Sequence, residues 1–100
     1  ALFFLNYQFE TTSKYLTRLG LSLYENRYNS EAAQVFERAL KLEEKDPSQV
    51  FYLISIYVDE NKYGEIPRLL EFAMNEFSHI VGIKEKIESV IKKLEPILIN

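Results

Sequence analysis

The sequence matches itself after a shift of about 34 residues, and this internal repeat constrains the fold more than any other feature. The paired residues are alike in size and polarity: Leu16 and Val50, Leu19 and Leu53, Leu23 and Tyr57, Ala32 and Ile66, Val35 and Leu69, Phe36 and Leu70, Glu37 and Glu71, Ala39 and Ala73, Leu40 and Met74. The register does not slip. Fixed periods of this length are typical of arrays in which each unit buries its apolar face against its neighbours.

Apolar residues recur at three- and four-residue steps throughout, which predicts helices with one buried face, whereas strand alternation and hairpin turns are missing. The first helix is expected between Ser13 and Asn26. The others and their inward residues are: a helix from Asn29 or Ser30, with Ala32, Val35, Phe36, Ala39, Leu40 and Leu42; one after Asp46, with Val50, Leu53, Ile54 and Tyr57; one from Gly64 to Glu76, with Ile66, Leu69, Leu70, Ala73 and Phe77; and one from Ile80 or Ile83 to Leu98, with Ile83, Ile87, Val90, Ile91, Leu94 and Leu98.

Local signals support these boundaries. Asp46, Pro47 and Gln49 form a capping-box-like start for the third helix. Pro67 falls in the first turn of the fourth helix, where the backbone N–H has no partner inside the helix to lose. Asn29 and Ser30 are both residues that favour an N-cap, so either is expected to cap the second helix.

The spacing Leu16-x-x-Leu19-Gly20-x-x-Leu23, followed by Ala32-x-x-x-Phe36-x-x-Ala39, resembles the tetratricopeptide repeat consensus. The resemblance implies an all-α fold of about five helices, in which antiparallel helix pairs stack as a short right-handed α-solenoid. In such units small residues sit where two helices approach most closely, a role that falls to Gly20, Ala32 and Ala39. The second unit departs from the consensus, with Ile54 and Ile66 in place of small residues.

The resemblance divides the single domain 1–100 into repeat 1 at 13–45, repeat 2 at 46–78 and a C-terminal closing helix at 79–100. Residues 1–12 lie outside the pattern and are apolar, with Leu2, Phe3, Phe4, Leu5, Tyr7 and Phe9. We interpret them as the second helix of a preceding unit or as an extension of the first helix. The alternative is a segment that binds a partner or lies near a membrane.

Charge and composition exclude several functions. Twelve basic and fifteen acidic residues give a net charge of −3 without a basic cluster, so nucleic acid and anionic membranes are not expected as direct partners. No stretch is apolar for long enough to insert into a membrane. The absence of Cys excludes disulfides and thiolate zinc sites, while cytoplasm, periplasm and extracellular space all stay open, with cytoplasm slightly favoured.

Residues that could support catalysis are sparse, so we expect no enzyme activity, no cofactor and no metal. His79 is the only histidine and falls at a junction between helices, which favours a solvated turn residue. Glu43, Glu44 and Asp46 lack the alternating spacing and central Gly of a calcium loop. The three glycines are isolated and cannot form a phosphate-binding loop.

The resemblance instead implies a protein-protein interaction module that binds a peptide or helix of a partner in the concave groove of its first helices. Carried over position by position, the groove residues are Lys14, Thr17, Leu21, Tyr24, Glu25, Ser48, Phe51, Ser55, Val58 and Asp59. Among these, Leu21, Tyr24, Phe51 and Val58 are not needed for the predicted core stripes and would anchor the partner. Alternatively they pack on the fifth helix or on segment 1–12. Family members that clamp a chaperone carboxylate need Lys and Asn where this chain has Thr17, Leu21 and Ser55, so that variant is not expected.

Two other functions stay open. The chain could be a structural segment of a longer solenoid, or could self-associate through its apolar ends, Leu2 to Phe9 and Ile97 to Ile99. It could also be the peptide-sensing regulatory domain of a larger protein.

Overall fold

The structure is a computed structural model, and it describes residues 12–99. Within this range the chain is all-α, as predicted, with five α-helices, one 3₁₀ turn and no strand. The elements are α2 (Thr12–Glu25), α3 (Asn29–Ala39), α4 (Pro47–Asp59), η1 (Tyr63–Glu65), α5 (Ile66–Phe77) and α6 (Ile83–Ile99). The expectations for residues 1–11 lie outside the described residues.

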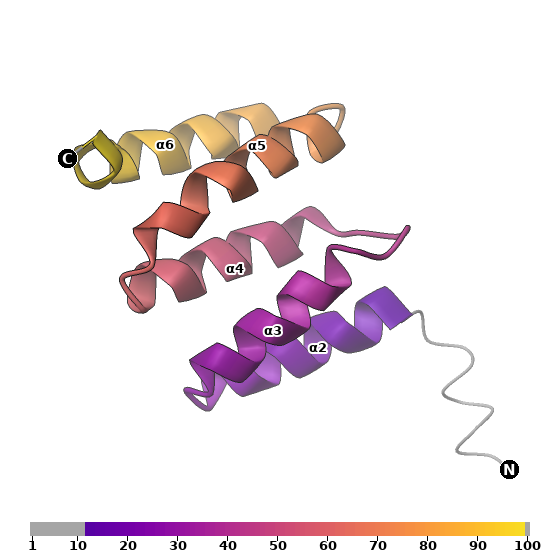
Figure 1. Cartoon of the computed structure of the whole chain (residues 1–100). Helices are drawn as coiled ribbons and strands as arrows, with labels where there is room; N and C mark the ends of the chain where they lie inside the picture. The colour runs from indigo at the N-terminus through magenta and orange to yellow at the C-terminus, as the bar shows by residue number, and fades with distance from the viewer. Residues whose placement is uncertain (1–11, 100) are drawn as a thin grey trace, which may run out of the picture.

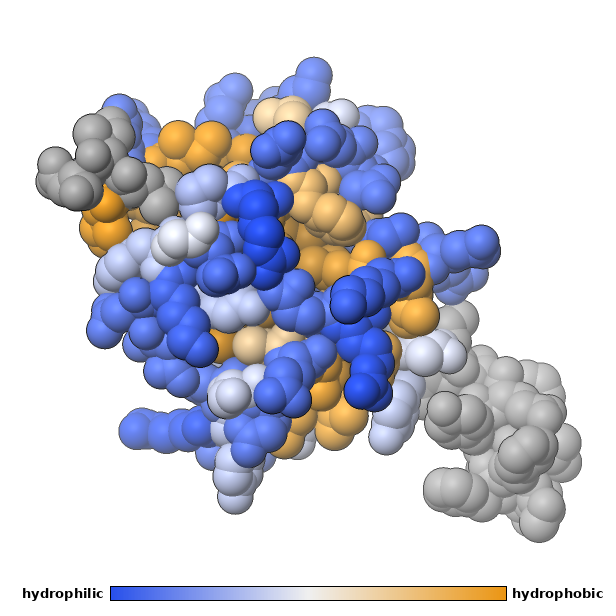
Figure 2. Space-filling view, in the orientation of Figure 1, coloured by the Kyte–Doolittle hydropathy of each residue, from blue (hydrophilic) through white to orange (hydrophobic). Residues whose placement is uncertain are grey.

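The helices follow one another in space as they do in sequence. Each packs mainly on the helices before and after it in the chain, and Figure 1 shows this order running from α2 and α3 through α4 to α5 and α6. Polar side chains cover most of the face in Figure 2, with apolar side chains showing between them. The core therefore lies between successive helices.

Most of the predicted inward residues are buried. The core draws on every helix from α3 to α6, and its largest fully buried apolar side chains are Phe36, Leu53, Ile56, Ile66, Leu69, Ile87 and Val50. Leu16 of α2 is buried as well. Burial of one such side chain contributes about 1.5–3 kcal/mol, so these stripes account for the positions of the helices.

Arg27 and Asn61, one repeat period apart, both adopt the left-handed conformation, with φ of 65° and 58°. The backbone bonds around them also correspond: Tyr28 N–H to Leu23 O (2.8 Å) and Arg27 N–H to Tyr24 O (3.0 Å) at one turn, Lys62 N–H to Tyr57 O (2.8 Å) and Asn61 N–H to Val58 O (3.1 Å) at the other. This pair of bonds is a Schellman motif, which satisfies the last carbonyls of a helix. Both α2 and α4 therefore end in the same way.

At Gly20, α2 packs closely against α3. A β-carbon built there would lie 2.6 Å from Cζ of Phe36, closer than any real contact. The ring of Phe36 is fully buried and stacks on Tyr52, with the ring centroids 5.8 Å apart. Glycine is therefore required by the packing of a large aromatic ring, in agreement with the role predicted for it.

The start of α4 confirms the predicted capping box and adds a contact that was not predicted. Asp46 accepts a hydrogen bond from Ser48 N–H (2.8 Å), and Gln49 Oε1 accepts one from Asp46 N–H (3.2 Å). Gln49 is fully buried, and its Nε2 donates to Ser13 Oγ and Thr17 Oγ1, both 2.8 Å away. The same amide thus caps α4 and ties it to α2.

Two local predictions about α3 were wrong. Tyr28, rather than Asn29 or Ser30, is the N-cap of α3, and it makes no side-chain cap bond. The helix ends at Ala39 instead of Leu42 because the last amides bond three residues back, Lys41 to Arg38 (3.1 Å) and Leu42 to Ala39 (3.2 Å).

Ile91, expected to point inward from α6, is 41% exposed. The buried or half-buried residues of α6 are Ile83, Ile87, Val90 and Leu94, at alternating steps of four and three. Ile91 lies about 100° around the helix from Val90 and so points off this stripe. The side chain of Leu98 lies outside the described residues.

Candidate binding groove

A cavity of about 450 Å³ lies between α4 and α6. It is lined by Tyr24, Phe51, Tyr52, Ile54, Ser55, Val58, Asp59, Lys86, Val90, Lys93 and Leu94. We call it the α4–α6 groove. Phe51, Ser55 and Val58 lie on one face of α4 because they are three or four residues apart, and α6 supplies the facing wall.

The groove brings together Tyr24, Phe51, Ser55, Val58 and Asp59, which are half of the residues predicted for it. The other five lie elsewhere: Lys14 and Thr17 line a separate cavity of about 340 Å³ with Ser13, Arg18 and Asp46; Leu21 is half-buried against the core; Glu25 is exposed; and Ser48 is half-buried in the first turn of α4. The ten residues predicted for the groove therefore do not line one continuous cavity.

Phe51 corrects the expectation that the groove anchors are free of the core. Its side chain is 9% exposed and belongs to the core, and Nζ of Lys86 lies 4.6 Å from its ring centroid in a cation–π contact. Leu21, Tyr24 and Val58 are half-buried and pack against the same core. Packing on α6, the alternative raised above, is thus correct for Phe51.

Tyr24 and Asp59 close the groove where α2 meets α4. The Tyr24 hydroxyl donates to Asp59 Oδ2 over 2.6 Å. Burial, together with this bond to a carboxylate, raises the pKa of Tyr24 to about 12. The hydroxyl therefore keeps its hydrogen at neutral pH and continues to link the two helices.

The wall formed by α6 was not predicted. Val90 and Leu94 are half-buried there, while Lys86 and Lys93 are exposed beside them. The amphipathic pattern of this helix predicts its apolar stripe, but it does not predict which helix the stripe packs against. The groove thus has an apolar floor with two ammonium groups and one carboxylate at its edges.

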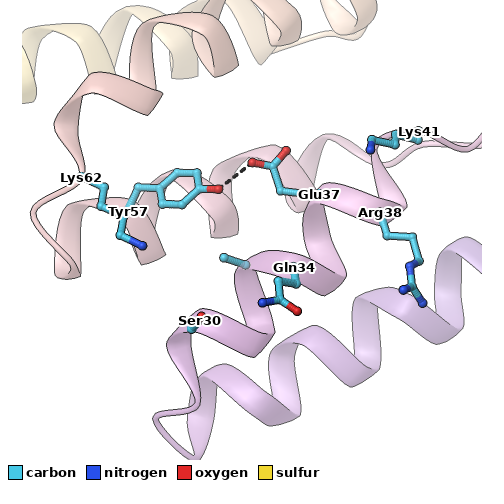
Figure 3. A pocket seen from close by; sticks show the side chains of 8 residues that line it. Ser30, Gln34, Glu37, Arg38, Lys41, Tyr57 and Lys62 are labelled. Atoms are coloured by element: carbon cyan, nitrogen blue, oxygen red, sulfur yellow. Dashed lines mark hydrogen bonds between the residues drawn. The ribbon is translucent and has the colours of Figure 1, made fainter.

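A second cavity, of about 570 Å³, lies on α3 and the end of α4 (Figure 3). It is lined by Ser30, Ala33, Gln34, Glu37, Arg38, Lys41, Tyr57 and Lys62, and we call it the α3 cavity.

A hydrogen-bonded cluster borders the α3 cavity. Tyr57 donates its hydroxyl hydrogen to Glu37 Oε2 over 2.6 Å, and Arg68 donates from both terminal nitrogens to the two oxygens of Glu37. Arg68 also bonds Glu65 (3.0 Å). The cluster joins α3, α4, η1 and α5.

The charges of this cluster stabilise one another. Burial alone would raise the pKa of Glu37, but the hydrogen bonds from Arg68 and Tyr57 outweigh it and hold that pKa below its ordinary value. The pKa of Tyr57 is raised by burial and by its bond to Glu37. The bonds to Glu37 and Glu65 likewise raise the pKa of Arg68. Glu37 is therefore an ionised carboxylate whose negative charge is already paired with Arg68.

Other features bear on the function classes considered above. Among residues 12–99, no group of three or more His, Asp or Glu side chains is arranged to hold a metal ion. None of the described helices is both long and apolar enough to cross a membrane. His79 is exposed in the turn between α5 and α6, as expected.

Comparisons of the chain with protein-family models, with curated proteins and with solved structures find no match.

Proposed function

We propose that this chain is a non-enzymatic protein-binding module and that it binds a peptide or helix of a partner protein in the α4–α6 groove. The observation that carries the proposal is that one cavity is lined by Tyr24, Phe51, Ser55, Val58 and Asp59. These are five of the ten groove positions that the tetratricopeptide resemblance implies. An apolar floor with a few polar groups at its edge is typical of binding sites.

The assignment to two tetratricopeptide-like units and a closing helix belongs to the same proposal. It is supported by burial that recurs after one repeat period, as in Ala32 and Ile66 or Ala39 and Ala73. It is also supported by the matching turns at Arg27 and Asn61. A repeated turn returns the chain at a similar angle, which is what a stacked array requires.

The groove favours a partner segment that combines apolar and acidic side chains. Val58, Val90 and Leu94 offer partly covered apolar surface, and aliphatic or aromatic side chains of a partner would bury against it. Lys86 and Lys93 attract a carboxylate at the edge, whereas Asp59 is already bonded to Tyr24. A short amphipathic helix with one or two Glu or Asp residues meets both requirements.

The test is a selection of displayed random dodecapeptides on the purified chain, followed by affinity measurements on the variants Val58→Lys and Ile91→Lys. Both variants place the same charge on a helix, but only Val58 lines the groove. We expect selected peptides rich in apolar and acidic residues, weakened about tenfold or more by Val58→Lys and little by Ile91→Lys. Phe51 is not used, since its truncation would also remove core packing.

Failure to select any saturable binder would contradict the proposal. So would selected peptides whose affinity is the same for Val58→Lys as for the unaltered chain, provided that both fold, as judged by circular dichroism.

A second candidate function, assembly into a longer array, is favoured by apolar side chains left exposed near the C-terminal helix. Val81 is 98% exposed, and Ile91 and Ile97 are each 41% exposed. Another unit that packed on α6 would cover these side chains. Light scattering tests it: a mass that rises with concentration and returns to the monomer value in Ile91→Lys/Ile97→Lys supports assembly, and a strict monomer contradicts it.

A further inference from the structure

Three of the eight residues that line the α3 cavity are basic, in a chain whose net charge is −3. Arg38 comes from the last turn of α3, Lys41 from the turn that follows α3, and Lys62 from the turn after α4. Figure 3 places Lys62 on one side of the cavity and Arg38 and Lys41 on the other. The cavity shares no lining residue with the α4–α6 groove.

None of these three cations forms a salt bridge with an Asp or Glu in the described part of the chain. Glu37 is the one acidic residue in the cavity lining, and Arg68 and Tyr57 already occupy both of its oxygens. The positive charge of Lys41 helps to lower the pKa of Glu37, but Lys41 forms no hydrogen bond with it. The cavity therefore presents a surplus of positive charge.

The rest of the lining resembles a surface for a polypeptide. Gln34 and Ser30 lie between the charged sides in Figure 3 and can bond a main chain, and Ala33 is buried in the lining. Cations on two sides suit two carboxylates along an extended segment better than one compact anion. Nucleic acid would need a longer run of phosphate contacts than three cations provide.

We propose that the α3 cavity is a second binding site, which takes an acidic peptide segment through Arg38, Lys41 and Lys62. Its carboxylates pair with the two basic sides, while the main chain between them bonds Gln34 and Ser30. A module with both sites would hold its partner at an apolar and at an acidic segment, and linking two sites raises the overall affinity without new contacts.

The experiment titrates the ¹⁵N-labelled chain with hexaglutamate, acetylated and amidated at its ends, in low salt. The variants Lys41→Gln/Lys62→Gln and Lys84→Gln/Lys92→Gln lose the same charge from exposed positions, but the second pair lies on α6 away from both cavities. We expect chemical-shift changes centred on α3 and the 60–62 turn, an affinity about tenfold lower in the first variant and less than about twofold lower in the second.

Equal losses in the two variants would mean that the peptide responds only to net charge, and the proposal would be wrong. It would also be wrong if hexaglutamate did not bind saturably, or if single-stranded hexathymidylate bound more tightly with the same dependence on Lys41 and Lys62. Because all four lysines are exposed, both variants are expected to keep the helical circular dichroism spectrum.

Discussion

The ring of Phe36 lies against the α-carbon of Gly20 and leaves no space for a β-carbon there. This contact sets how closely α2 approaches α3, and Phe36 cannot turn aside because it is fully buried and stacked on Tyr52. The close packing of α2 on α3 therefore depends on the absence of a side chain at position 20.

Gly20→Ala is expected to lower the free energy of unfolding by up to about 2 kcal/mol. Overpacking a rigid core costs about 1–3 kcal/mol, and the better helix propensity of Ala returns about 1 kcal/mol. Urea denaturation measures the difference. Gly64→Ala is the control, because a β-carbon there meets nothing within 4 Å and the change should be neutral or stabilising. Equal effects at both glycines would contradict the close contact.

Gln49→Ala is expected to destabilise the chain by about 2 kcal/mol. The change removes the cap bond to Asp46 and leaves Ser13 Oγ and Thr17 Oγ1 without their donor. Gln34→Ala, an exposed change of the same type, should cost less than about 0.5 kcal/mol. Thermal and urea unfolding of both variants compare them, and a Gln49 effect as small as that of Gln34 would mean that the buried bonds contribute nothing.

Stability is expected to fall in acid partly through Glu37. Its pKa in the folded chain is below that of the unfolded chain, about 4.3, so its contribution is present above that pH and is lost as pH falls through the folded pKa. Arg68 is half exposed, so the contribution is about 1 kcal/mol or less.

The measurement is the free energy of unfolding at pH 6 and pH 3 for the unaltered chain, Glu37→Gln and Glu71→Gln. Glu37→Gln should lose less stability between the two pH values than the unaltered chain. Glu71→Gln is the control for removal of a carboxylate, because Glu71 occupies the matching position one repeat period later and forms no ion pair within residues 12–99. A loss in Glu37→Gln as large as in the unaltered chain would refute the assignment.

Arg27→Gly is expected to raise the free energy of unfolding by about 0.5–1 kcal/mol. A non-glycine residue with positive φ is strained, and glycine relieves the strain at this position of a Schellman motif. Asn61→Gly should gain less, because Asn tolerates the left-handed region better than Arg. Asn26→Gly, one residue earlier and outside that region, should instead be destabilising. The urea midpoints of the three variants test this order of stabilities, and a midpoint for Asn26→Gly above that of the unaltered chain would contradict it.

Features that depend on neighbouring residues alone were predictable from the sequence. The capping box at Asp46 and Gln49 and the first-turn position of Pro67 are of this kind, and the structure has both. The bonds from Gln49 to Ser13 and Thr17 were not predictable, since they depend on how α4 docks on α2.

The residues of the α4–α6 groove likewise fall into some that were predictable from the sequence and some that were not. Phe51, Ser55 and Val58 share a face of α4 by helical spacing, so their proximity followed from the sequence. The wall formed by Lys86 and Val90 did not, because an amphipathic stripe specifies that a helix is covered and not which helix covers it.

Because α6 forms one wall of the groove, the proposed binding is coupled to the docking of that helix. The contact of Lys86 with Phe51 exists only while α6 is in place, and so does the cavity. If α6 is docked in a fraction f of molecules, the apparent dissociation constant equals the intrinsic one divided by f. Substitutions at Ile83 or Ile87, which are buried on α6, would therefore weaken the proposed binding without touching the partner, and a bound partner would slow hydrogen exchange along α6.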